Sequence, residues 1–298
     1  MVELHEVRCP VTAPLIRLCL CVGLLSDPRL ATAASNQANE GVSRPTPSAA
    51  EQEKLLAAMR RYAAGYVANL PNFLCVQVTQ QYEAGKKPTR WHKGDTLTAK
   101  LVFNEGREER TLEEVNDRPV RPGTRRGRTP LTTEGEFGML LSEVFDETSQ
   151  TTFLWNGWDV IRGKEVAVFN YAIDRSHSTL SLALSDLARA VVPYHGLVYA
   201  DPTTAQVWRI TNSASDIPPE IQTKSISTTI DYSEIGIAGI TYLLPVQATV
   251  LLATGSNNIR NEMQFTGYRR FEADSTITYN PSVPDTRAAT GKPNSAGH

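Results

Sequence analysis

The stretch YHGLVYADPTTAQVWRITN, residues 194–212, holds two runs of β-forming residues separated by Asp-Pro-Thr-Thr. Proline presets its own φ angle, and the side chains of Asp and Thr can hydrogen-bond to nearby backbone groups, so the four residues favour a turn. The stretch therefore predicts a β-hairpin that turns at residues 201–204. The two strands of a hairpin pair antiparallel, and the fold depends on how many further strands join them.

Runs of similar character occur on both sides of the hairpin, and most are separated by short turn signals. Short turns can connect only antiparallel neighbours, because a parallel crossover needs a dozen or more residues. We therefore expect about ten strands in one antiparallel sheet, which curls when it is this wide and needs a cover over its apolar face. The runs outside the hairpin are 73–82, 96–104, 151–155, 158–161, 165–174, 176–184, 224–232, 240–252, 259–267 and 268–279.

Two segments are candidates for that cover. Residues 50–70 repeat apolar side chains at helical spacing, which predicts an amphipathic helix. Ser48 with Glu51 three residues later forms the pattern of a capping box at its start. A second, short helix is predicted at 134–144, inserted between strands.

The chain ends differ in composition from this central part. Residues 1–33 combine arginines, a short apolar run and Ala31-Thr32-Ala33, as in a signal peptide, and the run is too short for a permanent transmembrane segment. Polar, Pro-containing residues 34–49 predict a disordered linker, and 281–298 a disordered tail. We expect a 50–280 domain in a periplasmic or secreted protein. The net charge of −2 argues against a nucleic-acid partner.

Three short stretches resemble the family of periplasmic lipoprotein carriers that includes LolA, LolB and RseB. Residues 196–210 (GLVYADPTTAQVWRI) are similar to its hairpin of strand, Asp-Pro-x-Thr and strand with Arg. The sequences YLLP at 242–245 and YRRF at 268–271 are similar to its last strands. Over residues 50–280 the resemblance implies a mainly β (α+β) fold: an open antiparallel β-half-barrel with a helical lid over a hydrophobic cavity.

Catalytic signatures are missing from the sequence. The histidines make no HExxH pattern, and there is no nucleophile elbow, Walker loop or dinucleotide fingerprint. Pairs such as Glu143 and Asp146 are common on solvated surfaces. Cys75 is the one cysteine after the leader, so it is expected to be a buried apolar side chain. We expect no enzymatic activity, no cofactor and no metal.

Two groups of residues are candidates for binding. Aromatic and apolar side chains of the helix and neighbouring strands would be core by default, or would line an acyl-chain pocket if the sheet is under-filled. They are Leu55, Met59, Tyr62, Trp155, Trp158, Phe169, Tyr171, Tyr199 and Trp208. Five arginines in eleven residues would be a mobile surface loop by default, or would dock to anionic head groups at a membrane surface. They are Arg118, Arg121, Arg125, Arg126 and Arg128.

These features favour a secreted, non-enzymatic envelope protein that binds a lipid or a lipid-modified protein in an apolar cavity. The alternative is an interaction module of the RseB kind, which recognises another envelope protein and holds no stable small ligand.

Overall fold

The fold is described from a computed structural model that covers residues 44–120, 137–185, 188–221 and 223–271. The described residues from Pro45 onward belong to one compact unit. The predicted signal peptide and the predicted tail lie outside the described residues, as does most of the predicted linker, so these three segments stay predictions.

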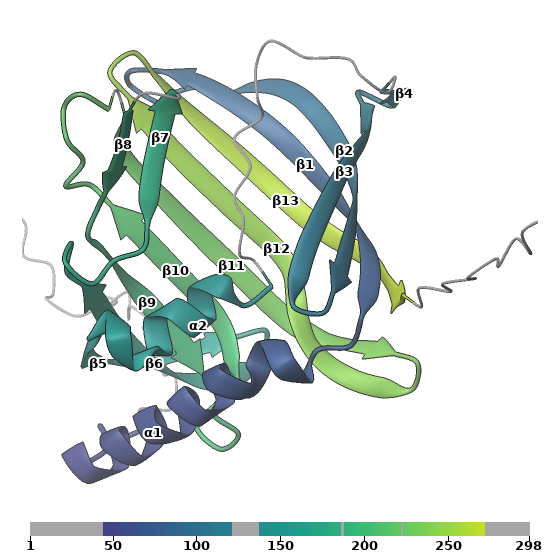
Figure 1. The fold of residues 1–298 in the computed structure, drawn as a ribbon. Coiled ribbons are helices and arrows are strands. Elements are labelled where there is room, and N and C mark those ends of the chain that lie inside the picture. The colour runs from purple at the N-terminus through teal and green to yellow at the C-terminus, as the bar shows by residue number, and fades with distance from the viewer. Residues whose placement is uncertain (1–43, 121–136, 186–187, 222, 272–298) are drawn as a thin grey trace, which may run out of the picture. The chain divides into compact units, whose positions relative to one another are not determined.

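Eleven antiparallel strands form one sheet that is not closed into a barrel (Figure 1). Their order across the sheet is β4-β3-β2-β1-β13-β12-β11-β10-β9-β6-β5, and β7 pairs with β8 in a separate two-stranded sheet. The strands are β1 Phe73–Gly85, β2 His92–Asn104, β3 Arg107–Val115, β4 Arg118–Pro119, β5 Thr152–Ile161, β6 Lys164–Ile173, β7 Ser181–Ser185, β8 Ala188–Val191, β9 Tyr194–Ala200, β10 Val207–Ala214, β11 Thr223–Ile237, β12 Ile240–Thr254 and β13 Asn257–Arg270.

The first and last long strands of the sheet are neighbours, because β1 pairs with β13 on one edge and with β2 on the other. Along β1, buried and half-buried residues alternate from Phe73 to Gln80, as expected for a strand with one face against the interior. Phe73 lies opposite Phe103, and Thr79 lies opposite Leu97 on β2 and Met263 on β13. This register places the odd-numbered side chains from Phe73 to Thr79 on the inner face; beyond the register shift between Gln80 and Tyr82, the buried residue is Ala84.

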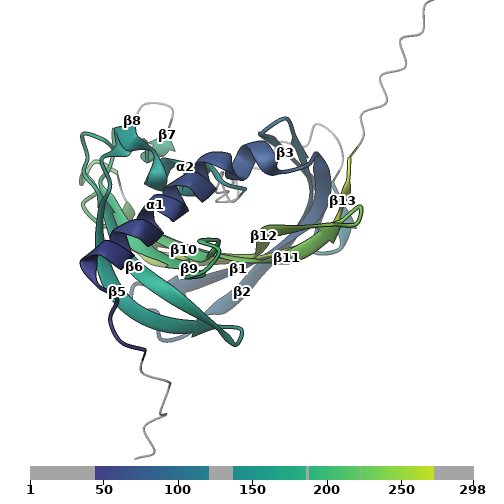
Figure 2. The ribbon, with the colours of Figure 1, turned by 90° about the horizontal axis from the view of Figure 1, so that it is seen from below.

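Helices cover the concave side of the curved sheet, as seen along the sheet in Figure 2. Helix α1 (Ala49–Tyr66) continues into the 3-10 turn η1 (Val67–Asn69), and α2 (Met139–Phe145) is followed by η2 (Glu147–Ser149). The capping box is present: Ser48 N–H donates to the Glu51 carboxylate at 2.8 Å, and Glu51 N–H donates to Ser48 Oγ at 3.4 Å. Two N-terminal donors are thereby satisfied.

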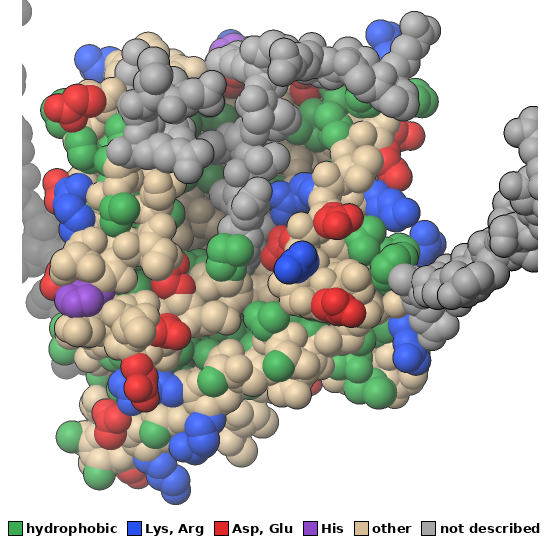
Figure 3. Space-filling model, viewed as in Figure 1, with side chains coloured by type: hydrophobic (Ala, Val, Ile, Leu, Met, Phe, Trp, Pro, Cys, Tyr) green, Lys and Arg blue, Asp and Glu red, His purple; other side chains and the backbone are tan. Residues whose placement is uncertain are grey.

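Helix α1 buries one stripe, Leu56, Met59, Ala63 and Tyr66, whose spacing of three and four keeps them on one face. Charged side chains of both signs lie on its exposed side (Figure 3). Tyr66 also contacts the sheet through its hydroxyl, which donates a hydrogen bond to the backbone carbonyl of Leu243 on β12 at 2.7 Å. The helix is therefore held to the sheet by apolar burial and by one long-range hydrogen bond.

Two glycines allow close approaches that a Cβ atom would prevent. At Gly196 on β9 a Cβ would lie 1.9 Å from the Thr211 carbonyl oxygen. Gly138 precedes α2 with φ of +115°, and a Cβ there would lie 2.7 Å from Cγ2 of Val67. The second contact joins the start of α2 to η1, just after the end of α1.

The predicted fold class is confirmed: a mainly β chain with an open antiparallel sheet, a leading helix and a short inserted helix. The 194–212 stretch forms β9 and β10, and the Asp201 carboxylate accepts from the N–H groups of Thr203 and Thr204 at 2.7 and 2.8 Å. The turn therefore forms by the side-chain chemistry that predicted it.

Several predicted boundaries are wrong. Asn156-Gly157 is not a turn between two strands but a bulge within β5, where the register shifts and Gly157 has φ of +151°. The expected strand at 176–184 begins only at Ser181 and belongs to the small β7-β8 sheet. The expected division between residues 267 and 268 is absent, because β13 continues through Gly267 to Arg270.

The sequence prediction also missed β3 entirely. Its residues Glu108, Arg110 and Leu112 are half-buried on the inner face, and the outward residues between them are exposed. Charged residues on both faces hide the alternation of apolar and polar residues that marks a strand. The charged side chains on the inner face of β3 line a cavity.

Candidate functional site

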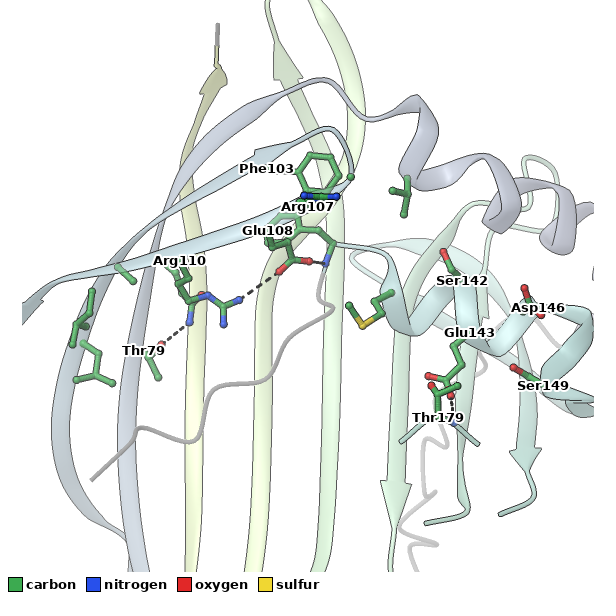
Figure 4. Close-up of a pocket in the computed structure, with 18 of the residues that line it drawn as sticks. Thr79, Phe103, Arg107, Glu108, Arg110, Ser142, Glu143, Asp146, Ser149 and Thr179 are labelled. Carbon is green, nitrogen blue, oxygen red and sulfur yellow. Dashed lines mark hydrogen bonds and ion pairs between the residues drawn. The ribbon is translucent and has the colours of Figure 1, made fainter. Parts of the chain in front are cut away.

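A cavity of about 1080 Å³ lies on the concave side of the sheet. The inner faces of β1, β2 and β3 form one wall, and α2, η2 and the residues beside them form the other (Figure 4). Proteins hold small ligands in pockets of about 300–1,000 Å³, so this cavity is large enough for such a guest.

The cavity lining is amphipathic. Its apolar side chains are Val67, Leu97, Ala99, Phe103, Leu112, Phe137 and Met139. Its polar side chains are Gln77, Thr79, Arg107, Glu108, Arg110, Ser142, Glu143, Asp146, Thr148, Ser149 and Thr179. The lining therefore offers an apolar surface together with hydrogen-bonding groups, which suits a molecule that is itself part apolar and part polar.

An aromatic cluster supports the apolar part of the lining. Phe73 and Phe103 lie opposite each other on β1 and β2 and stack with ring centroids 5.0 Å apart. Phe137 joins them, 5.3 Å from Phe73, and also contacts Phe265 edge-on at 5.4 Å. All four rings are almost fully buried. The end of the cavity at Phe103 and Phe137 is thus a rigid, packed wall.

One charged pair lies on the β3 wall. Nη2 of Arg110 is 3.6 Å from Oε2 of Glu108, and the two side chains are 16% and 17% exposed. Glu108 also accepts through Oε1 from the backbone N–H of Phe137, at 3.2 Å. Figure 4 shows both side chains on the same side of the cavity. The attraction between the two charges offsets part of the cost of taking both of them out of water.

Carboxylates of the helical wall are held by backbone donors. Glu143 accepts from the N–H of Thr179 at 2.9 Å, and Figure 4 shows this pair across from β3. Hydrogen bonds from the hydroxyl and N–H of Thr148 lower the pKa of Asp146, so that carboxylate stays charged at neutral pH. Glu143 and Asp146, a pair typical of a solvated surface by sequence, both line the cavity.

Cys75 lies beside this site but is not a reactive thiol. It is fully buried on the inner face of β1, and burial raises the pKa of its thiol to about 12. The thiolate is therefore scarce at neutral pH, as expected for a buried apolar side chain.

Gln77 is deeply buried in the lining, with 4% of its surface exposed. Its Nε2 donates to Thr79 Oγ1 at 3.0 Å. Within the part of the chain that the structure describes, Oε1 of Gln77 has no hydrogen-bond partner. Buried polar atoms are normally paired, so this acceptor marks a specific point on the cavity wall.

The nine apolar candidates from the sequence lie elsewhere, and none is among the residues that line this cavity. Met59, Phe169, Tyr171 and Trp208 are buried in the core, whereas the other five are half-buried. Tyr62 lines a smaller hollow of about 240 Å³ beside α1. Their role in ligand binding stays a prediction.

Several of these nine residues are held by other contacts. The ring centroid of Trp155 lies 5.0 Å from that of Trp158 and 5.2 Å from that of Phe169, and both contacts are edge-on. The sheet therefore brings these three rings together. Lys164 Nζ lies 3.9 Å above the Trp208 ring. The hydroxyl of Tyr171 donates to the Thr211 carbonyl at 2.7 Å. These contacts are typical of side chains that stabilise the fold.

Of the five arginine candidates, only Arg118 lies in the described residues, exposed on the short strand β4. Arg121, Arg125, Arg126 and Arg128 lie outside them, so anionic docking stays a prediction.

The residues that sequence reasoning missed are the polar ones on the inner faces of β1 and β3. A signal was available in β1, where the inward positions change from Phe73 and Cys75 to Gln77 and Thr79. A strand that turns polar on its buried face indicates a polar point inside the fold.

Two further findings concern the described residues only. No three His, Cys, Asp or Glu side chains among them gather closely enough to hold a metal ion. Neither of the helices described is both long and apolar enough to cross a bilayer.

Comparison with known proteins found no matching family profile and no matching curated protein. Solved structures similar to this chain include a LolA-superfamily protein from Nitrosomonas europaea, with 8% identity over 74% of this chain and 94% of that one and a TM-score of 0.37. A domain described as an outer membrane lipoprotein-sorting protein from Vibrio parahaemolyticus has 9% identity over 73% and 92%, with a TM-score of 0.40. A chain of the MucA/MucB complex of Pseudomonas aeruginosa has 9% identity over 74% and 100%, with a TM-score of 0.22. We therefore base the function on the cavity itself.

Proposed function

We propose that this protein is a non-enzymatic carrier of the cell envelope, which holds the apolar part of a lipid or of a lipid-modified protein in the cavity between β1–β3 and α2. The observation that carries the proposal is the amphipathic lining of a cavity of about 1080 Å³. The leader-like residues 1–33 support an envelope location.

The arrangement of the lining fits an amphiphile. Leu97, Ala99 and Leu112 follow one another across β2 and β3 and offer a surface for an acyl chain. The charged side chains of Glu108 and Arg110 lie next to this surface on β3. An acyl chain would gain about 0.8 kcal/mol for each CH₂ group that it buries.

The test is a titration with N-phenyl-1-naphthylamine, a neutral probe whose fluorescence rises in an apolar site. The wild-type chain should bind it saturably, and a lipid with an oleoyl chain should displace it. Ala99→Leu should weaken binding because the added side chain occupies the cavity, whereas Thr98→Leu on the outward face of the same strand should not. Non-saturable binding, or equal weakening in both variants, would rule out this cavity as the site.

A second candidate function is the interaction module, and one observation favours it. The edge strand β5 exposes Leu154 and Val160, which are 65% and 63% exposed. An edge strand offers unpaired backbone groups to which a partner's strand can add. Leu154→Lys with Val160→Lys should then abolish co-purification of a protein partner and leave probe binding intact. A partner lost only with Ala99→Leu would assign the interaction to the cavity.

A further inference from the structure

We infer that the cavity selects guests that carry a neutral hydroxyl group close to their acyl chain, and that Gln77 is the residue that recognises this group. The inference rests on the proposed function and specifies the chemistry of the guest. It starts from Gln77, a deeply buried side chain of the lining whose amide oxygen has no partner among the described residues.

The position of Gln77 is set by the register of the sheet. It lies opposite Ala99 on β2, and Ala99 lies opposite Leu112 on β3. All three side chains line the cavity, so the amide faces a surface that is otherwise apolar along this row. The small side chain of Ala99 leaves space directly beside the amide.

Only one of the two polar atoms of the Gln77 amide has a hydrogen-bond partner among the described residues. Its Nε2 donates to Thr79 Oγ1 at 3.0 Å, and within the described residues Oε1 has no partner although Gln77 is 4% exposed. Leaving a buried acceptor unpaired costs free energy, which a guest recovers if it donates a hydrogen bond there. A hydroxyl can donate and accept, so it matches the amide group in either of its two orientations.

The charges around the cavity argue against an anionic guest. Three carboxylates and two arginines line it, Glu108, Glu143, Asp146, Arg107 and Arg110, which gives a net charge of −1. The guanidinium of Arg110 already lies 3.6 Å from the Glu108 carboxylate. A fatty acid would bring a further negative charge into this setting and lose hydration, so a free carboxylate is disfavoured. A monoacylglycerol or a similar neutral hydroxylated lipid has a hydroxyl group for Gln77 and carries no negative charge.

The experiment compares two neutral ligands with the same acyl chain, 1-monooleoylglycerol and methyl oleate, by displacement of N-phenyl-1-naphthylamine from the full chain. Gln77→Met keeps the length of the side chain and removes its hydrogen-bonding groups. It should weaken monooleoylglycerol binding by about threefold to tenfold, the effect of one hydrogen bond, and leave methyl oleate unchanged. Gln264→Met, at an exposed position on β13, is the matched control and should change neither.

Each other outcome has a defined meaning. If Gln77→Met lowers the affinity for both ligands equally, or for neither, Gln77 does not recognise a hydroxyl and the inference is wrong. If neither ligand displaces the probe from the wild-type chain, the proposed function fails instead. Should Gln77→Met not fold, Thr79→Val removes only the hydroxyl that orients the amide and should lower the same preference. A Thr79→Val chain with an unchanged ratio of the two affinities would also overturn the inference.

Discussion

The same substitution, alanine to leucine, should have opposite effects on stability at two buried positions of the sheet. Ala99 is 6% exposed and lines the cavity, whereas Ala167 on β6 is fully enclosed by the core. A leucine at position 99 buries three more carbon atoms, worth about 2.4 kcal/mol at ~0.8 kcal/mol each. Subtracting about 0.5–1 kcal/mol of side-chain entropy leaves a gain of about 1.5 kcal/mol.

Ala167 is completely buried within the core cluster, so extra carbons there must displace packed neighbours. Overpacking of this kind costs about 1–3 kcal/mol. Denaturation of the ligand-free proteins in guanidinium chloride measures both changes, since a shift of the midpoint at constant slope reports a change in stability. If Ala99→Leu destabilises the protein as much as Ala167→Leu does, the space beside Ala99 is not open, and the reasoning about the cavity is refuted.

Three further predictions follow from named contacts. Gly196→Ala should lower the free energy of unfolding by about 1–3 kcal/mol or more, because its Cβ would lie 1.9 Å from the Thr211 carbonyl oxygen; a thermal melt equal to wild type would contradict this close approach. Asp201→Ala should cost about 1 kcal/mol by removing the acceptor of two turn N–H groups, measured by urea denaturation; a variant with Asn at this position should retain most of the stability. Burial raises the pKa of Cys75 to about 12 in the folded chain, whereas the thiol of the unfolded chain loses its proton near pH ~8.5. The stability that the buried neutral thiol contributes is therefore lost progressively as the pH rises above about 8.5. With Cys9, Cys19 and Cys21 replaced by serine, a thiol reagent should label Cys75 only on unfolding, and fast labelling of the native protein at pH 8 would show that the thiol is not buried.

The elements that could be predicted from the sequence are those whose signals are local. Ser48 and Glu51 form their capping box within one turn of helix, and the Asp201 turn is built from its own side chain. The helical period of residues 50–70 predicted an amphipathic helix, and α1 has one buried stripe. Such features depend on neighbours within about four residues, which a single sequence displays directly.

The cavity could not be predicted in the same way, because its lining depends on the register between strands. Gln77, Ala99 and Leu112 come together only when β1, β2 and β3 are aligned. The alternation that identifies strands assumes an apolar inner face, and in β3 that face carries Glu108 and Arg110. The pattern thus failed at the strand that borders the polar side of the cavity.

Native mass spectrometry of the protein, exported by cells and purified without detergent, tests the central claim most directly. We predict a species heavier than the chain by the mass of one neutral acyl lipid, and a marked loss of this species in Ala99→Leu but not in Thr98→Leu. A wild-type protein observed only at the mass of the chain, which also takes up no added monooleoylglycerol, would contradict the account.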